Sequence, residues 1–200
     1  MSTKTILITG ATDGIGKTTA KALAKQGHHL IIHGRNKEKA ISVCQEIKDE
    51  TGNQNVDYIL ADLLHLAEVK RMAAAFKSKY HQLDILINNA GAVFGKERSV
   101  TTEGLESTMA INVFAPLLLT ELLLDLLAKS PEARIVNVAS GAHAMVGKPD
   151  LEDMQFEKKY SFMDAYGKAK LYFIWLNQYL AKDLKKRGYE HITANSLHRV

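Results

Sequence analysis

The chain has 200 residues, of which 46% are apolar and 24% are charged, a composition typical of a globular domain that can bury a core. Its net charge of +4 is only mildly basic and gives little support to nucleic-acid binding. A single cysteine, Cys44, excludes an internal disulfide and fits a reducing compartment.

Short apolar runs alternate with longer helical patterns along the chain. Strands are predicted at Thr5–Thr9, His29–His33, Val56–Ala61, Ile85–Asn88, Arg134–Ala139 and Ile192–Leu197. Helical patterns lie near residues 15–27, 37–51, 66–80, 103–129 and 162–187. Apolar strands separated by helices indicate a parallel sheet covered on both faces, so we predict one doubly wound α/β domain of the Rossmann type over residues 1–200. Ligands should bind at the carboxyl ends of its strands, where the two longest loops, about 89–102 and 141–161, also lie.

A glycine-rich loop follows the first predicted strand and opens the first predicted helix. Gly10, Gly14 and Gly16 stand in ITGATDGIG with the spacing G-x-x-x-G-x-G. Glycine is needed where a backbone turns sharply or approaches a phosphate closely, and a helix N-terminus attracts that phosphate. The loop therefore predicts a dinucleotide-binding site, with a purely structural turn as the weaker alternative.

The same segment also resembles a second kind of phosphate-binding loop. ATDGIGKT, which begins at Ala11, nearly matches the pattern G-x-x-x-x-G-K-[ST] of nucleoside triphosphatases, and Asp62 could serve as the magnesium-binding aspartate. Ala11 stands where that pattern begins with glycine, however. The triphosphatase hypothesis also leaves Ser140, Tyr166 and Lys170 unexplained, so we favour the dinucleotide site.

The sequence at the end of the second predicted strand indicates which dinucleotide is bound. An acidic side chain there would accept the ribose 2′-hydroxyl of NAD, whereas this chain has Arg35 in IIHGRNKEK. A guanidinium group matches the geometry of a phosphate, and Lys17 could add positive charge nearby. We therefore expect NADP(H) to be preferred over NAD(H).

Three polar residues indicate a site of proton transfer. Tyr166 and Lys170 stand four residues apart in AYGKAKL, so their side chains share one face of the last predicted helix. A phenol is a poor proton donor near neutral pH unless a neighbouring positive charge favours its ionised form. Ser140 follows the fifth predicted strand and adds a hydroxyl.

Five motifs, taken in order, resemble those of the short-chain dehydrogenase/reductase family over essentially the whole chain. They are TGATDGIG at 9–16, NNAG at 88–91, Asn112 in MAINVFAPLLLT, VNVAS ending at Ser140, and YGKAK at 166–170. SGAH and the segment DLEDMQFEKKYSFMDAYGKAKL look more specifically like the retinol dehydrogenase-type branch. The resemblance implies a catalytic set of Asn112, Ser140, Tyr166 and Lys170.

The resemblance also implies a role for each residue of the site. Tyr166 would donate a proton to a substrate carbonyl oxygen while NADPH delivers hydride to its carbon, or accept the proton in reverse. Lys170 would favour the ionised tyrosine and bind the nicotinamide ribose, Ser140 would hold the carbonyl oxygen, and Asn112 would position a water. No metal site is predicted. The cofactor-binding residues would be Gly10, Asp13, Gly14, Ile15, Gly16, Arg35, Asn36, Asp62, Leu63, Asn89, Ala90, Gly91, Tyr166 and Lys170. Of these, Asp62 and Leu63 would border the adenine, and Asn89, Ala90 and Gly91 would border the cofactor ribose.

The resemblance ends at the sixth predicted strand. The family normally continues there with Pro-Gly and several dozen residues, whereas here SLH is followed by Arg199 and Val200. By resemblance, the last helix and the last strand of the fold would be absent. The sixth strand would then be an exposed edge and the substrate would be incompletely enclosed.

We therefore predict an NADP-dependent oxidoreductase that reversibly reduces aldehydes or ketones, with a truncated, non-catalytic dinucleotide-binding protein as the alternative. A strand-like run begins within a few residues of Met1 and leaves no signal peptide, so we expect a cytoplasmic protein. The apolar run Leu117–Ala128 is too short to span a bilayer. The helical patterns at 103–129 and 162–187 are candidates for a homodimer interface.

Overall fold

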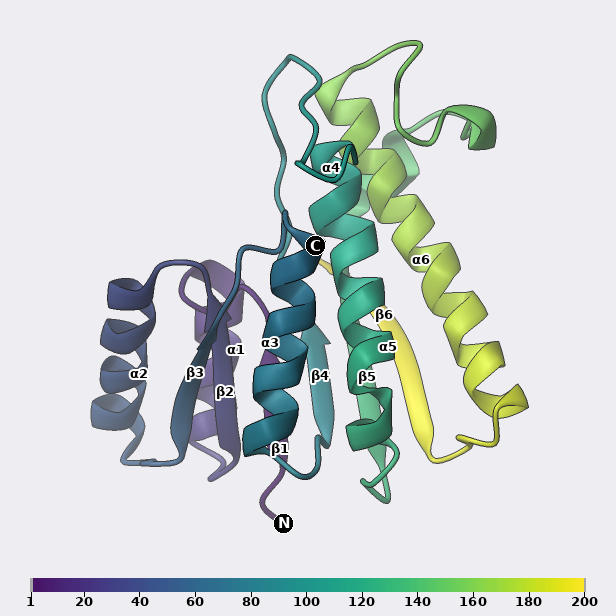
Figure 1. The fold of residues 1–200 in the computed structure, drawn as a ribbon. Helices are drawn as coiled ribbons and strands as arrows, with labels where there is room; N and C mark the ends of the chain where they lie inside the picture. Colours follow the sequence, from purple (N-terminus) through teal and green to yellow (C-terminus); the bar gives the residue numbers. More distant parts are fainter. Residues whose placement is uncertain (1, 200) are drawn as a thin grey trace.

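The computed structural model describes residues 2–199 and places them around one parallel sheet of six strands (Figure 1). The strands are β1 (Thr5–Ile8), β2 (His29–Gly34), β3 (Val56–Leu60), β4 (Ile85–Asn88), β5 (Ala133–Ser140) and β6 (Ile192–Arg199). Their order across the sheet is β3-β2-β1-β4-β5-β6. The predicted doubly wound α/β fold is thereby confirmed. The direction of winding reverses between β1 and β4, which is where such sheets bind their ligands.

The helices follow the predicted order, with differences at their ends. They are α1 (Gly14–Ala24), α2 (Lys37–Thr51), α3 (Leu66–Lys79), α4 (Ser107–Met109), α5 (Ala115–Leu127) and α6 (Phe162–Lys186). The first helix ends earlier than predicted because the chain turns at Gly27, which has φ +80°. The predicted loop 141–161 contains two short 3₁₀ turns, Gly141–Met145 and Leu151–Asp153.

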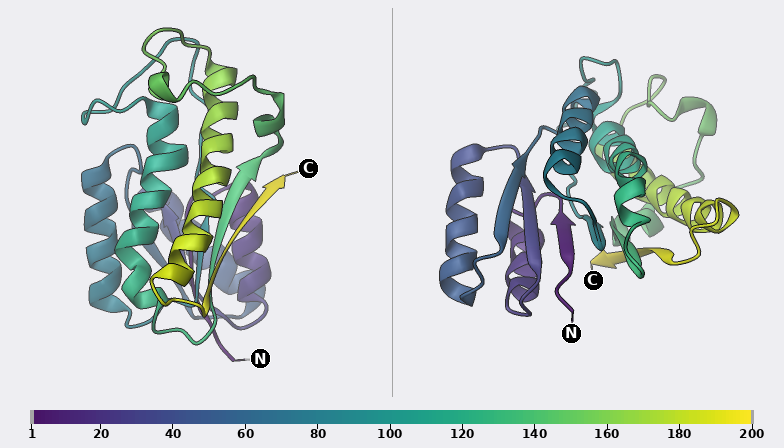
Figure 2. Two further views of the ribbon diagram at one scale, coloured as in Figure 1. Left: turned by 90° about the vertical axis from the view of Figure 1, so that its right-hand side faces the viewer. Right: turned by 60° about the horizontal axis from the view of Figure 1, so that its bottom comes forward.

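The core lies in two layers, one on each face of the sheet. One layer packs α3, α5 and α6 against strand residues such as Leu7 and Leu86. The other packs α1 and α2 against the neighbouring residues of the same strands, such as Ile6 and Ile87 (Figure 2). This alternation arises because successive strand side chains point to opposite faces. Burial of each of these large apolar side chains stabilises the fold by roughly 1.5–3 kcal/mol.

The helical segment that contains α4 and α5 forms part of this core. It runs from Ser107 through a π-helical turn, Ala110–Phe114, to Leu127. It is 21 residues long, and its most apolar 18-residue window has a mean hydropathy of 1.8, so by length and composition alone the segment could cross a membrane, which the shorter predicted run could not. However, 61% of its most apolar window is buried inside the protein, mainly against the sheet and α3. The burial is that of a core helix.

This helical segment begins later than the predicted residue 103 because a buried carboxylate caps it at Glu106. The Glu106 side chain is fully buried and accepts hydrogen bonds from the backbone N–H groups of Thr108 (2.9 Å) and Met109 (2.8 Å). The backbone N–H of Glu106 in turn donates to Oε1 of Gln155, at 2.7 Å, in the loop that follows β5. The cap thereby fixes where the helix carrying Asn112 starts.

Replacing Glu106 by alanine should lower the free energy of unfolding by about 2 kcal/mol, because two buried N–H groups lose a charged acceptor. Urea denaturation measures the change. The matched control is Glu132→Ala at an exposed position, which should change stability by less than about 0.5 kcal/mol. Equal effects of the two substitutions would contradict the capping role.

Candidate active site

The glycine loop packs closely against the segment that follows β4. Gly10 has φ +63°, and a Cβ atom there would lie 2.9 Å from the Cα of Ala90. A Cβ atom on Gly16 would lie 2.6 Å from Nδ2 of Asn89, which donates to the carbonyl oxygen of Gly10 at 3.1 Å. A side chain at either glycine would therefore separate the two segments.

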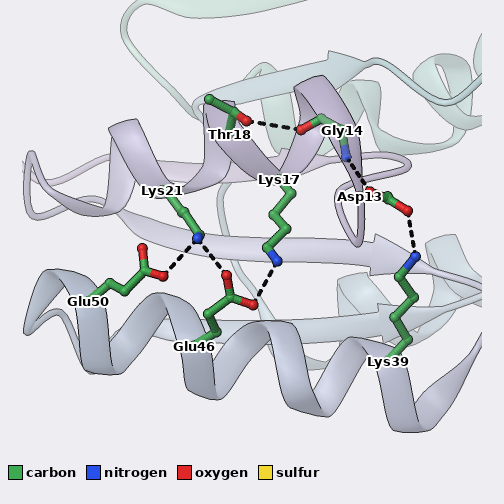
Figure 3. A network of polar contacts seen from close by, with 8 residues as sticks. All are labelled: Asp13, Gly14, Lys17, Thr18, Lys21, Lys39, Glu46 and Glu50. Carbon is green, nitrogen blue, oxygen red and sulfur yellow. Dashed lines mark hydrogen bonds and ion pairs between the residues drawn. The ribbon is translucent and has the colours of Figure 1, made fainter.

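Asp13 caps the first helix and joins it to the second. Its carboxylate accepts a hydrogen bond from the backbone N–H of Gly14 at 2.8 Å and pairs with Nζ of Lys39, at the start of α2, at 2.7 Å (Figure 3). The hydrogen bond from Lys39 and that from Gly14 lower the pKa of Asp13 below its ordinary value. The ion pair therefore connects the glycine loop to α2 beside the predicted cofactor site.

Lys17 does not lie where the sequence-based prediction put its charge. Its Nζ pairs with Oε2 of Glu46 on α2 at 2.6 Å, and Glu46 also binds Lys21 of α1 (Figure 3). These contacts hold α1 against α2, and none of the three residues lines the cavity described next. The prediction that Lys17 supplies charge to a cofactor phosphate is therefore not supported.

A cavity of about 870 Å³ lies at the carboxyl edge of the sheet. The predicted cofactor residues that line it are Gly10, Asp13, Arg35, Asn36, Asp62, Leu63, Asn89, Ala90 and Gly91. Gly14, Ile15 and Gly16 do not line it and instead form the first turn of α1 behind the loop. The carboxyl ends of β1 to β4 thus converge on one cavity, as predicted.

Sequence reasoning missed three polar residues that line this cavity, Thr12, His33 and Lys39. Lys39 stands four residues after Arg35, and both are exposed. The cluster of cations in RNKEK could have indicated Lys39 as a phosphate-binding residue. Its ion pair with Asp13 is a tertiary contact that the sequence does not show. His33 was marked by being a polar residue within an apolar strand, LIIHG.

Tyr166 and Lys170 share one face of α6, as their spacing predicts. Nζ of Lys170 lies 5.7 Å from the centroid of the Tyr166 ring. It also donates to the carbonyl oxygen of Val138 on β5 at 3.0 Å. Lys170 is 3% exposed, and this burial lowers its pKa to about 8 because desolvation disfavours the ammonium.

Ser140 ends β5 beside the helix that carries Tyr166. Its Oγ accepts a hydrogen bond from the backbone N–H of Ala142 at 3.3 Å, which leaves its own hydrogen available for donation. Gly167 packs on this turn, since a Cβ atom there would lie 2.8 Å from the carbonyl oxygen of Ala142. Ser140 is thereby held next to the first turns of α6.

Asn112 lies in the π-helical turn and faces Lys170 across Gly91. Its Nδ2 donates to the carbonyl oxygens of Ala92 (2.8 Å) and Thr108 (2.9 Å). Its Oδ1 is buried and has no hydrogen-bond partner among residues 2–199. A Cβ atom on Gly91 would lie 2.6 Å from this Oδ1 and 3.1 Å from Nζ of Lys170.

The four predicted catalytic residues do not line the cavity themselves. Asn112 and Lys170 meet it through Gly91, which does line it, while Tyr166 and Ser140 lie beyond, on α6 and at the end of β5. The buried, unpartnered amide oxygen beside an ammonium is a polar space that suits a water molecule. The arrangement therefore places Lys170 and Asn112 at the wall of the cavity, with Tyr166 and Ser140 behind them.

A doubly wound parallel sheet with a glycine loop and a cavity at its carboxyl edge is the arrangement of a Rossmann-type dinucleotide site, and here Lys170 of a tyrosine–lysine pair borders that cavity at Gly91. The family model described as short chain dehydrogenase matches residues 4–198. The chain belongs to this family. This membership decides against the nucleoside triphosphatase alternative. The lysine of the triphosphatase-like pattern, Lys17, pairs with Glu46 on α2 and does not line the cavity.

The similar proteins include two human dehydrogenases and a solved bacterial structure. Human polyprenol dehydrogenase is 39% identical over 94% of this chain and 58% of its own length. Human retinol dehydrogenase 13 is 37% identical over 98% of this chain and 58% of its own length, in line with the predicted retinol dehydrogenase-type branch. The structure of Pseudomonas aeruginosa RhlG in its NADP active-site complex has a TM-score of 0.78 and 29% identity over 98% of this chain and 72% of that chain. This chain therefore spans about three fifths of the length of the two curated relatives.

The stability of the protein should depend on pH through Lys170. Its folded-state pKa of about 8 lies below its ordinary value of 10.5, so between these values the unfolded chain binds more protons. The free energy of unfolding should therefore rise with pH across this window, by up to about 3 kcal/mol.

Urea denaturation of the wild type and of Lys170→Met between about pH 7 and pH 10 isolates this effect. Methionine keeps most of the side-chain volume and cannot be charged. The difference in stability between the two proteins should change with pH as stated. A difference that stays constant would show that the ammonium is not buried.

Proposed function

We propose that this protein is an NADP-dependent oxidoreductase that reversibly reduces an aldehyde or ketone to an alcohol. The observation that carries the proposal is the Tyr166–Lys170 pair on α6, whose lysine ammonium lies next to Gly91 at the wall of the cavity. The names of the two curated relatives, a polyprenol dehydrogenase and a retinol dehydrogenase, support an alcohol and its carbonyl counterpart as the substrate pair.

The residues of the site fit a nicotinamide dinucleotide. Gly10 and Gly16 keep the loop close to the segment after β4, and the N-terminus of α1 opens next to the cavity, as phosphate binding requires. The buried, unpartnered Oδ1 of Asn112 offers a polar atom at the inner end. When bound, the reduced cofactor supplies the hydride that the protein itself cannot.

The side chains of the chain then provide the proton and hold the carbonyl group. The Tyr166 hydroxyl gives its proton to the substrate oxygen, and the Lys170 ammonium stabilises the phenolate that remains. Ser140 donates its free hydroxyl hydrogen to the same oxygen, which stabilises the charge that develops there. Asn112 holds a water between its amide oxygen and Lys170, from which the proton is replaced.

Two cations support the preference for NADP(H) over NAD(H). Arg35 lines both the main cavity and an adjoining pocket of about 470 Å³. Lys39 lies at the same rim and is held there by Asp13. A phosphate on the adenosine ribose would find two positive side chains at this place.

Tyr166→Phe should lower the turnover of a carbonyl substrate by at least about 100-fold, because the only change is loss of the hydroxyl that supplies the proton. NADPH oxidation followed by absorbance measures the rate, and a fluorescence titration should show that NADPH still binds. Tyr179→Phe on the exposed face of α6 is the matched control and should keep full turnover. Turnover by Tyr166→Phe close to that of the wild type would refute its role as the acid.

Arg35→Ala should weaken NADPH binding by roughly 10- to 100-fold and leave NADH binding almost unchanged, because NADH lacks the phosphate that the guanidinium binds. Calorimetric titration with each cofactor measures both affinities. Arg134→Ala, an exposed position at the opposite end of the sheet, is the control. Equal losses for the two cofactors would show that Arg35 does not distinguish them.

A panel of aldehydes and ketones separates catalysis from binding alone. Consumption of NADPH with any of them supports the oxidoreductase, whereas measurable NADPH binding without turnover of any compound supports the non-catalytic alternative. The cytoplasmic location and the homodimer stay predictions.

A further inference from the structure

His33 is a buried polar side chain on β2 that the proposed mechanism does not use. Only 4% of the residue is exposed, although it lines the inner wall of the cofactor cavity. Its ring has one neighbour on each side along the sheet. Nδ1 lies 3.1 Å from the backbone nitrogen of Gly10, and Nε2 lies 3.0 Å from the carbonyl oxygen of Ala61.

These two neighbours fix the protonation of the ring. A backbone N–H can only donate and a carbonyl oxygen can only accept, so Nδ1 accepts from Gly10 and Nε2–H donates to Ala61. Only the neutral imidazole with its proton on Nε2 satisfies both contacts. A protonated ring would set a second N–H against that of Gly10.

The charged groups around His33 do not alter this state. Asp62 follows Ala61 and favours protonation, while Asp13 on the glycine loop, Arg35 on the strand end and Lys39 on α2 line the same cavity. Burial outweighs Asp62 and lowers the pKa of His33 to about 4, so the ring stays neutral near pH 7.

The contacts of His33 join the ends of three strands. The carbonyl oxygen of His33 accepts a hydrogen bond from the backbone N–H of Ala11 at 2.9 Å, so two successive residues of the glycine loop bind to this one histidine. Gly10 is held in its left-handed conformation, with φ +63°, between the ring and Ala90. On the other side the ring holds Ala61, which precedes Asp62 at the end of β3.

We propose that His33 is a positioning residue that holds the glycine loop against the end of β3 and thereby sets the affinity for the dinucleotide. The inference rests on the proposed function, since it assumes that this cavity binds the cofactor. Without the hydrogen bond from Gly10 to His33, the glycine loop would be free to reorient before binding. The cofactor would then have to order the loop on binding, which would lower its affinity. His33 removes that cost in advance.

Two substitutions divide the contacts of the ring. His33→Asn places an amide oxygen at about the position of Nδ1 and can still accept from Gly10, whereas His33→Gln reaches toward Ala61 and loses that acceptor. NADPH binding should weaken about tenfold more in His33→Gln than in His33→Asn, as expected for one buried hydrogen bond. Fluorescence titration of the folded proteins measures both, and thermal melts without cofactor report any loss of stability separately.

Nitrogen-15 NMR of the histidine-labelled wild type tests the arrangement without any variant. The His33 ring should remain the neutral Nε2–H form as the pH falls from about 8 to about 5. Titration near its ordinary pKa of about 6.5, or a proton on Nδ1, would overturn the inference.

The outcomes separate this inference from the proposed function. If the wild type binds NADPH and the His33→Gln and His33→Asn variants have the same NADPH affinity as each other, His33 has no positioning role and the proposed function stands. If the wild type binds neither NADPH nor NADH, the proposed function fails and the role of His33 in cofactor binding fails with it.

Discussion

The site depends on one buried cation, the ammonium group of Lys170. Within residues 2–199 no carboxylate pairs with it, and its only direct hydrogen bond is to the carbonyl oxygen of Val138. Burying a charge in this way costs stability, as its lowered pKa reflects. Such a group is expected where chemistry uses it. Two neighbouring features accommodate this ammonium group. Gly91 has no side chain that would crowd it, and the π-helical turn brings the amide of Asn112 to the same place.

The parallel sheet determines how this cation meets the rest of the site. Because the carboxyl ends of parallel strands share one edge, the glycine loop, the strand-end cations and the segment after β4 all border one cavity. Close backbone packing at Gly10 and Gly16 sets the shape of that cavity, and polar contacts from His33 and Asn89 fix the loop between them. Binding surface and acid–base groups thus come from separate stretches of chain that the fold brings together.

Much of this was predictable from local signals. The bounds of α2 were predicted correctly because Asn36 caps its start, while Gly52, with φ +73°, ends it. The four-residue spacing of Tyr166 and Lys170 predicted their contact. What failed depends on tertiary partners: Lys17 faces Glu46 because α1 packs on α2, and no periodicity along α1 shows which helix will lie beside it. The late start of the helix at Ser107 follows from the buried cap at Glu106, which residues distant in the sequence hold in place.

The most direct test of the central claim is isotope transfer from cofactor to substrate. NADPH carrying deuterium at the transferable C4 position is incubated with the protein and a panel of aldehydes and ketones, and the alcohol formed is analysed by mass spectrometry. Hydride transfer at this site should place one deuterium on the carbinol carbon of the product, and Tyr166→Phe should form little of this labelled alcohol. An alcohol without deuterium, or no alcohol from any compound although NADPH binds, would contradict the assignment of this site to hydride transfer.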